Sequence, residues 1–216
     1  MFCRHDLVWL TGRGWDAAHA AAPSVQHAAI EQWRRENWPS VVRRADAGLA
    51  AGHVSLGIPL PPASNGVKGR VALTVSAADI ARSSPALALA DAAAAAPDRW
   101  RQPLDVLAGS MALRAYGSLA MQAITGQAYL TAASDIDLLF FPADRAALSA
   151  GLALLERHAA VLPLDGEIVF PSGAAVSWKE WLGAGPAKAR ARVLVKDAGA
   201  VRLAPIEALL ATLESA

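Results

Sequence analysis

The sequence predicts an α+β protein in two parts, an N-terminal mixed α/β domain at residues 1–97 and a second domain at residues 98–216. Its 216 residues are 54% hydrophobic and only 18% charged, which favours a folded core over disorder. Proline-rich extended stretches mark the first part, whereas strand and helix patterns alternate in the second. Such an alternation is typical of a small mixed sheet backed by helices.

The first part is expected to mix helices with short strands. Residues 28–35 form a helix that ends before Pro39, because the residue preceding a proline avoids the α region. Alternating apolar and smaller or polar side chains predict a strand at residues 69–76. Further elements are expected as a strand at 38–44, an extended segment at 56–62, a turn at 65–66 and a helix start at 76–79.

The second part is expected to alternate helices and strands. Residues 113–116 form a short strand that enters the pair Gly117-Ser118, and a helix follows over residues 118–124. The apolar run at residues 135–141 predicts a buried strand. The other expected elements are helices at 103–111, 143–161, 179–184 and 205–215, a hairpin from 168–170 and 174–178, and a strand at 191–196. These strands predict a sheet of about three to five strands.

Charge and cysteine content narrow the functional classes. The formal net charge is +1, so no overall field directs the chain to nucleic acid or to a membrane, and a phosphate-binding surface has to be a local patch. Cys3 is the single cysteine, which excludes an intrachain disulfide and suits a reducing cytoplasm. The N-terminus lacks the apolar core of a signal peptide. Asp91 and Pro97 interrupt the alanine-rich stretch, which therefore predicts a soluble helix rather than a membrane span.

Two aspartates, Asp135 and Asp137, stand at the start of a predicted buried strand. Side chains alternate across a strand, so both carboxylates point to the same face, about 7 Å apart along the strand. Two like charges at this distance repel each other, and a hard divalent cation such as Mg²⁺, which prefers oxygen ligands, relieves the repulsion. The pair therefore predicts a metal site suited to displacement at phosphorus.

Upstream, Gly117 and Ser118 have the character of an anion cradle. The glycine lets the backbone approach a phosphate closely, and the helix that follows directs its free N–H groups toward it. Each motif alone is common, and an alternative stays open in which Ser134 and Asp135 are turn residues at a solvated strand end. The combination of both motifs favours metal-assisted phosphoryl transfer.

The glycine-serine pair followed by Asp-x-Asp resembles the signature of the nucleotidyltransferase superfamily related to DNA polymerase β. The spacer between Ser118 and Asp135 is longer than usual there, which points to a particular branch. The whole chain resembles the malonate decarboxylase holo-acyl-carrier-protein synthase family, also called phosphoribosyl-dephospho-CoA transferase. The matching segments are residues 4–10, 38–44, 56–62, 114–139, 164–180 and 193–196. Met121 departs from this pattern, since tryptophan is usual there, and residues 65–70 are looser than the expected Gly-Lys-Arg-Arg cluster.

The resemblance implies a nucleotidyltransferase-like domain at residues 98–216, and for residues 1–97 we expect donor binding and a lid over the phosphates. It implies transfer of a prosthetic group from 2′-(5″-triphosphoribosyl)-3′-dephospho-CoA to a serine of the malonate decarboxylase acyl carrier protein. Pyrophosphate is the other product, and Mg²⁺ held by Asp135 and Asp137 is the implied cofactor. In such chemistry the protein mainly positions its substrates and neutralises charge.

The resemblance also implies roles for single residues. A third carboxylate from a later strand is expected to activate the acceptor hydroxyl. Asp165 and Glu167 are the candidates, and Glu167 is favoured because it lies closer to the interior of the predicted strand. Arginine suits phosphate because its rigid fork donates twice, although a solvated or paired surface charge is the ordinary alternative. The expected phosphate ligands are Gly117, Ser118, Ser134, Arg114, one of Arg43 and Arg44, Lys68, Arg70 and Lys196.

Three other functions are alternatives. Another enzyme of the superfamily, such as a small-molecule or citrate-lyase-type prosthetic group transferase, would use the same motifs. A non-catalytic module that binds the carrier protein would not need Asp135 and Asp137. Nucleotidyl transfer to nucleic acid is disfavoured by the near-neutral charge and the lack of a basic stripe with stacking aromatic residues.

Overall fold

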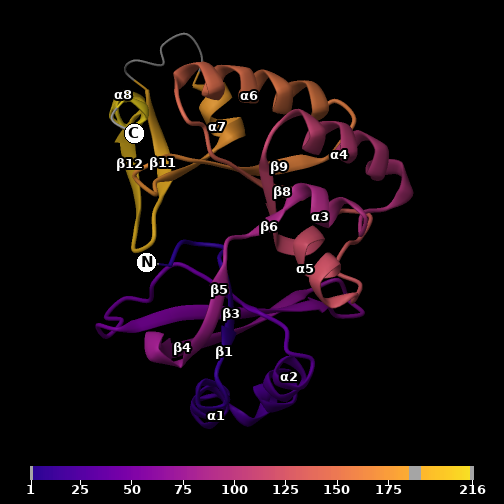
Figure 1. Cartoon of the computed structure of the whole chain (residues 1–216), viewed down its shortest axis with the longest axis vertical. Helices are drawn as coiled ribbons and strands as arrows, with labels where there is room; N and C mark the ends of the chain where they lie inside the picture. The colour runs from indigo at the N-terminus through magenta and orange to yellow at the C-terminus, as the bar shows by residue number, and fades with distance from the viewer. Residues whose placement is uncertain (1, 185–190, 215–216) are drawn as a thin grey trace.

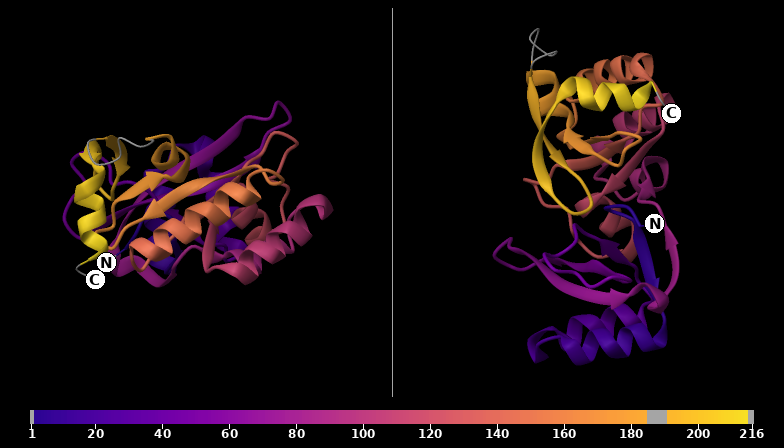
Figure 2. Two further views of the ribbon diagram at one scale, coloured as in Figure 1. Left: turned by 90° about the horizontal axis from the view of Figure 1, so that it is seen from above. Right: turned by 90° about the vertical axis from the view of Figure 1, so that its left-hand side faces the viewer.

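The computed structural model describes residues 2–184 and 191–214, and these form two β-sheets with helices packed on them (Figure 1). The right-hand view of Figure 2 shows the first part, in indigo and purple, below the second part, in orange and yellow. The α+β class predicted from the sequence is confirmed. Within the described ranges, no helix is both long and apolar enough to cross a membrane.

The first sheet is antiparallel throughout and has the strand order β4-β3-β2-β1-β5. Its strands are β1 (Leu7–Leu10), β2 (Ser40–Val42), β3 (His53–Pro62), β4 (Lys68–Ser76) and β5 (Ile80–Ser84). Helices α1 (Gly12–Ala21) and α2 (Ser24–Arg35) contact β4 and β3 respectively and cover its outer face (Figure 1). Trp33 and Leu56 are fully buried in the core that results.

The second sheet has seven strands in the order β12-β11-β10-β9-β8-β7-β6. They are β6 (Leu87–Ala88), β7 (Leu113–Tyr116), β8 (Ile136–Phe140), β9 (Leu164–Val169), β10 (Ala175–Ser177), β11 (Arg192–Lys196) and β12 (Val201–Pro205). Only β8 and β9 pair in parallel among the described strands, and the helix between them is the crossover that such a pairing needs. This parallel pair forms the centre of the site described below.

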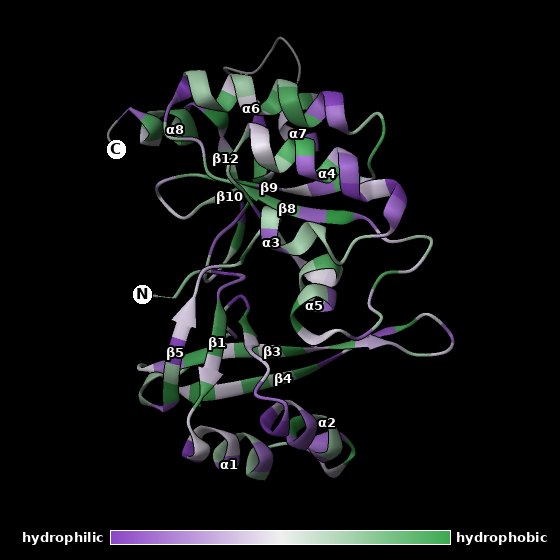
Figure 3. Cartoon of the chain, turned by 45° about the vertical axis from the view of Figure 1, so that its right-hand side comes forward, coloured by the Kyte–Doolittle hydropathy of each residue, from purple (hydrophilic) through white to green (hydrophobic). Residues whose placement is uncertain are grey.

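Six helices belong to the second part as the structure describes it. They are α3 (Leu89–Ala93), α4 (Asp98–Ser110), α5 (Gly117–Thr125), α6 (Arg145–His158), α7 (Trp178–Gly183) and α8 (Ile206–Leu210), with 3-10 turns η1 (Ala77–Asp79) and η3 (Ala211–Leu213) elsewhere. Helices α4 and α6 bury apolar side chains in one core with β7, β8 and β9. Both helices mix hydrophobic and hydrophilic residues along their length (Figure 3).

One face of the second sheet is left without these helices, and we call it the open face. On β7, Leu113 and Ala115 are buried in the helix-covered core, so Arg114 and Tyr116 point to the open face. The same alternation places two further sets of side chains there: Asp137 and Leu139 from β8, and Asp165, Glu167 and Val169 from β9. The first part of the chain lies over this face.

Helix α5 and the loop after it fasten the two parts together. Met121, at the position where the resembled family has tryptophan, is buried in the core of the first part together with Tyr129. The Tyr129 hydroxyl donates a hydrogen bond of 2.8 Å to the backbone carbonyl of Pro59 on β3. The departure at Met121 therefore concerns packing between the two parts.

The structure differs from the sequence predictions at short or edge elements. The second sheet is larger than predicted, because the edge strands β6 and β12 were not foreseen. The alanine-rich stretch gives only the short α3, and the predicted helix start at residues 76–79 is a single 3-10 turn. The first sheet ends at Ser84 and the second begins at Leu87, ahead of the boundary expected at residue 97, and Pro97 is the N-cap residue of α4.

Candidate active site

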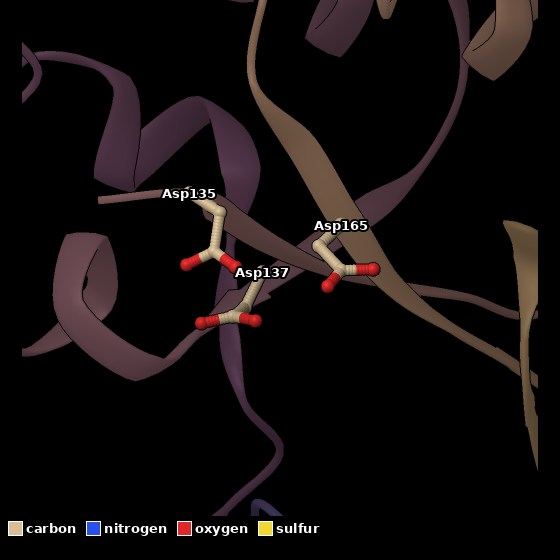
Figure 4. A group of neighbouring side chains, drawn as sticks. All are labelled: Asp135, Asp137 and Asp165. Carbon is tan, nitrogen blue, oxygen red and sulfur yellow. The ribbon is translucent and has the colours of Figure 1, made fainter. Parts of the chain in front are cut away.

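Three aspartates gather at one end of the parallel strand pair. Asp135 immediately precedes β8, Asp137 lies within it, and the register of the sheet places Asp165 of β9 directly beside Asp137. One carboxylate oxygen from each residue lies within 4.8 Å of the other two. Figure 4 shows the three carboxylates turned toward a common space. We call this set the acidic cluster.

The acidic cluster fits a divalent cation. Its ligand atoms are all carboxylate oxygens, which hard cations prefer. Burial raises the pKa of Asp137 to about 6, and the charges of Asp135 and Asp165 add to the shift. Without a cation, the protein therefore holds three acids that resist being ionised together.

Gly117 places the start of α5 against this cluster. Its φ of 66° lies in the left-handed region, and a Cβ there would collide with the carboxylate of Asp137. Glycine is thus required both by the backbone and by the close approach. Ser118, the next residue, is 8% exposed, and its hydroxyl accepts a 2.9 Å hydrogen bond from Lys68 Nζ. This bond ties β4 of the first part to the predicted anion cradle.

A cavity of about 820 Å³ opens between the two parts beside the acidic cluster, and we call it the first cavity. Asp137 and Gly117 line it from the second part. The basic residues that line it are Arg4, Arg43, Arg44, Arg70 and Lys196. A basic wall that faces a potential metal site suits a polyphosphate, because the basic side chains and a metal ion can together neutralise its negative charge.

The predicted arginines of β2 do not have equal freedom. Arg43 binds the carboxylate of Asp46 with both terminal nitrogens and donates to the backbone carbonyl of Leu56 at 2.9 Å. Arg44 is exposed and, in the part of the chain that the structure describes, makes no ion pair within 4 Å. Arg44 is therefore the better placed of the two to contact a ligand in the first cavity.

Glu167, the favoured third carboxylate, does not belong to the acidic cluster. It is only 3% exposed and forms ion pairs with Arg4 at 3.2 Å and with Lys196 at 3.0 Å. His5 Nε2 lies 3.6 Å from its second oxygen. Burial alone would raise the pKa of Glu167, but these three neighbours outweigh it and lower the pKa to about 2. The geometry favours Asp165 over Glu167 as the third carboxylate.

Two other predicted ligands lie away from the first cavity. The Ser134 hydroxyl accepts a 2.9 Å hydrogen bond from the backbone N–H of Thr131, so it shapes the loop that leads into β8. Arg114 donates to the carbonyl of Ala86 at 2.8 Å and lines a different cavity on the open face. Lys68, Arg70 and Lys196, by contrast, are all brought toward the site.

Sequence reasoning gave no role to the N-terminal segment that crosses the open face. Arg4 and His5 line the first cavity, and the His5 ring packs on Tyr116 with 4.0 Å between ring centroids. His5 has a φ of 72°, a conformation that a residue with a side chain rarely adopts without a constraint from its surroundings. The matching segment at residues 4–10 was the available signal for these residues.

Comparison with known proteins identifies the chain as a transferase. Residues 3–86 match the model of the phosphoribosyl-dephospho-CoA transferase MdcG N-terminal domain, and residues 87–207 match that of its C-terminal domain. The chain therefore belongs to the phosphoribosyl-dephospho-CoA transferase family. The change from one model to the other falls between the two sheets.

Relatives carrying that name are similar over most of their length. The phosphoribosyl-dephospho-CoA transferase of Xanthomonas campestris pv. campestris is 41% identical over 213 residues, which cover 95% of both chains. That of Bradyrhizobium diazoefficiens is 39% identical over 186 residues, which cover 82% of this chain and 80% of the relative. No solved structure matches the chain.

Proposed function

We propose that the chain transfers the phosphoribosyl-dephospho-CoA group from 2′-(5″-triphosphoribosyl)-3′-dephospho-CoA to a serine of the malonate decarboxylase acyl carrier protein. Pyrophosphate is released, and Mg²⁺ is the metal. The observation that carries the proposal is the acidic cluster at the edge of a cavity with a basic wall. The names of the relatives support the transferred group.

In this proposal the donor triphosphate lies in the first cavity. Arg44, Arg70 and Lys196 bind its oxygens, and Gly117 leaves room for the phosphates beside the first turn of α5. Asp135, Asp137 and Asp165 hold the metal ion. Mg²⁺, when bound there, would neutralise charge that develops on the transferred phosphoryl group.

The reaction is one displacement at phosphorus. The serine oxygen forms a bond to the phosphorus of the phosphoribosyl group while the bond from that phosphorus to the pyrophosphate oxygen breaks. The serine proton passes to a carboxylate of the acidic cluster, and we assign this role to Asp165 because it is more accessible than Glu167, which Arg4, His5 and Lys196 surround. Lys179 Nζ lies 3.7 Å from Asp165, at a longer distance than the pairs around Glu167.

Two alternatives use the same fold. A citrate-lyase-type or other small-molecule nucleotidyltransferase would keep the acidic cluster and change only the donor or acceptor. A non-catalytic module that binds the carrier protein would not need three mutually repelling carboxylates, whose buried member has a raised pKa. The acidic cluster therefore favours an enzyme over a binding module.

The test combines the protein with apo carrier protein, synthetic donor and Mg²⁺, and follows the carrier protein by intact mass. We expect the mass of the carrier protein to rise by that of the phosphoribosyl-dephospho-CoA group. Asp135→Asn should lower the rate by about a thousandfold or more, in line with the loss of a group that acts in the transition state. Asp105→Asn, an exposed aspartate on α4, is the matched control and should leave the rate unchanged. Normal transfer by Asp135→Asn would contradict the metal mechanism.

A further inference from the structure

A second cavity of about 820 Å³ lies on the open face, next to the first. Residues two positions apart on the open face of one strand line different cavities. On β7, Tyr116 lines the first cavity and Arg114 lines the second. On β8, Asp137 lines the first cavity and Leu139 lines the second. The second cavity therefore lies over the same face of the sheet as the acidic cluster, two residues further along β7 and β8.

The boundary between the cavities is formed by the N-terminal segment. Arg4 and His5 line both of them. Arg4 is held there by its ion pair with Glu167, so the segment crosses the sheet at a fixed place. A ligand that starts at the acidic cluster and continues along the strands passes this segment and enters the second cavity.

The second cavity differs from the first in its chemistry. Leu139, Phe141 and Val169 give it an apolar floor. Its carboxylates are Asp6, which accepts a 2.8 Å hydrogen bond from the backbone N–H of Cys3, and the neutralised Glu167. Arg114 also lines it, and within the described residues this arginine makes one hydrogen bond and no ion pair at 4 Å or less.

We propose that the second cavity binds the dephospho-CoA portion of the donor, with Arg114 on its diphosphate and the pantetheine chain on the apolar floor. This inference rests on the proposed function. That donor joins a triphosphate, which needs a metal and a basic wall, to a long portion with an adenosine, a diphosphate and an uncharged chain. Apolar pockets of a few hundred to about a thousand Å³ with few polar groups are typical of sites for such ligands. The two cavities match the two ends of the donor in character, and they adjoin.

Direct binding tests the subsite without turnover, by calorimetry of the full chain with dephospho-CoA, with pantetheine and with pyrophosphate plus Mg²⁺. Val169→Trp fills the cavity from the open face of β9. It should weaken dephospho-CoA and pantetheine about tenfold or more and leave pyrophosphate within about twofold. Val161→Trp is the matched control, since Val161 is 66% exposed and lies outside both cavities. Melting temperatures near that of the unaltered chain are the check that both variants are folded.

A second variant separates the diphosphate from the chain. Arg114→Gln should weaken dephospho-CoA about tenfold to a hundredfold, the range expected for a lost hydrogen-bonded charge partner, and should leave pantetheine within about twofold. Pantetheine lacks the diphosphate, so equal losses for both ligands would overturn the assignment of Arg114. Unchanged binding of dephospho-CoA by Val169→Trp would overturn the subsite itself.

Three further results would also overturn the subsite. The first is no binding of dephospho-CoA to the unaltered chain, and the second is an equal loss of dephospho-CoA and pyrophosphate binding in Val169→Trp. The third is a KM of Val169→Trp that is raised for the carrier protein and unchanged for the donor. The last result would mean that the cavity takes the acceptor. The transfer assay keeps the two proposals apart. A chain that binds dephospho-CoA in the second cavity and transfers nothing would overturn the proposed function alone.

Discussion

Two carboxylates of β9, Asp165 and Glu167, stand two residues apart on one face of one strand and lie in opposite electrostatic surroundings. Asp165 joins two other aspartates, and its neighbour Asp137 has a pKa raised to about 6. Glu167 is enclosed by basic groups, and its pKa is lowered to about 2. One end of the strand thus carries three carboxylates with one longer ion pair, from Lys179 to Asp165, whereas the charge of Glu167 is compensated at closer range within the fold.

The difference separates a candidate catalytic site, the acidic cluster, from a set of structural ion pairs, those of Glu167 with Arg4 and Lys196. Glu167 links the N-terminal segment, β9 and β11 through Arg4 and Lys196, and it has no need of a ligand. The three carboxylates of the acidic cluster have less countercharge, with Lys179 at 3.7 Å from Asp165, so binding of a cation would stabilise them. Changes at the two places should therefore have opposite signatures, one in stability and the other in the response to metal.

The largest effect on stability is expected from breaking the ion pairs of Glu167. Glu167→Gln keeps the shape of the side chain but leaves Arg4 and Lys196 without a countercharge. We expect a loss of about 2–4 kcal/mol in the free energy of unfolding, at or below the range for a broken buried pair because both basic partners are partly exposed. Urea denaturation at pH 7 measures it.

The control is an exposed pair. Glu214→Gln breaks the ion pair with Arg145, in which both side chains are about half exposed, and should cost less than about 1 kcal/mol. Equal effects of the two substitutions would contradict the structural role of Glu167.

The contrast between these carboxylates also explains what the sequence could predict. The strand at residues 113–116, the pair Gly117-Ser118 and the shared face of Asp135 and Asp137 follow from local rules of alternation and backbone freedom, and the structure has them. The choice between Asp165 and Glu167 depends on the register of a parallel pairing across a helical crossover. No local pattern fixes that register, and the rule that an interior strand position is more favourable led to Glu167.

Other residues were beyond prediction for the same reason. The crossing of Arg4 and His5 over the open face is a contact between distant parts of the chain. Arg114 was expected at the cradle because it leads into Gly117-Ser118. Alternation does put it on the correct face, but Tyr116 lies nearer the acidic cluster and Arg114 falls into the second cavity.

A smaller effect is expected from the titration of the acidic cluster. Because the pKa of Asp137 is raised to about 6 by folding, the folded state binds more protons than the unfolded state between its ordinary pKa, near 4, and 6. Stability from this group is present below that window and is lost as the pH rises through it. In buffer with EDTA, the free energy of unfolding should fall by about 2 kcal/mol more in the unaltered chain than in Asp137→Asn between pH 4.5 and pH 7.

The matched control for the titration is again Asp105→Asn, at an exposed position on α4. Glu167 contributes little in this window, because its lowered pKa keeps it ionised throughout and its stabilising effect is lost only toward pH 2. A steeper fall in Asp137→Asn than in the unaltered chain would reverse the sign and contradict the raised pKa that burial and the neighbouring carboxylates give Asp137.

The smallest effect, and the one that separates the two carboxylates of β9 most directly, is stabilisation by Mg²⁺ at pH 7. A ligand that binds only the folded state at ten times its Kd adds about 1.4 kcal/mol to the free energy of unfolding. We expect this gain in the unaltered chain and in Glu167→Gln, and its loss in Asp165→Asn, measured by urea denaturation with and without the ion. Since Asp165 belongs to the acidic cluster and Glu167 has its charge compensated by Arg4 and Lys196, only the first should bind metal. If Glu167→Gln abolished the gain while Asp165→Asn kept it, Glu167 would be the third carboxylate, as the sequence alone favoured.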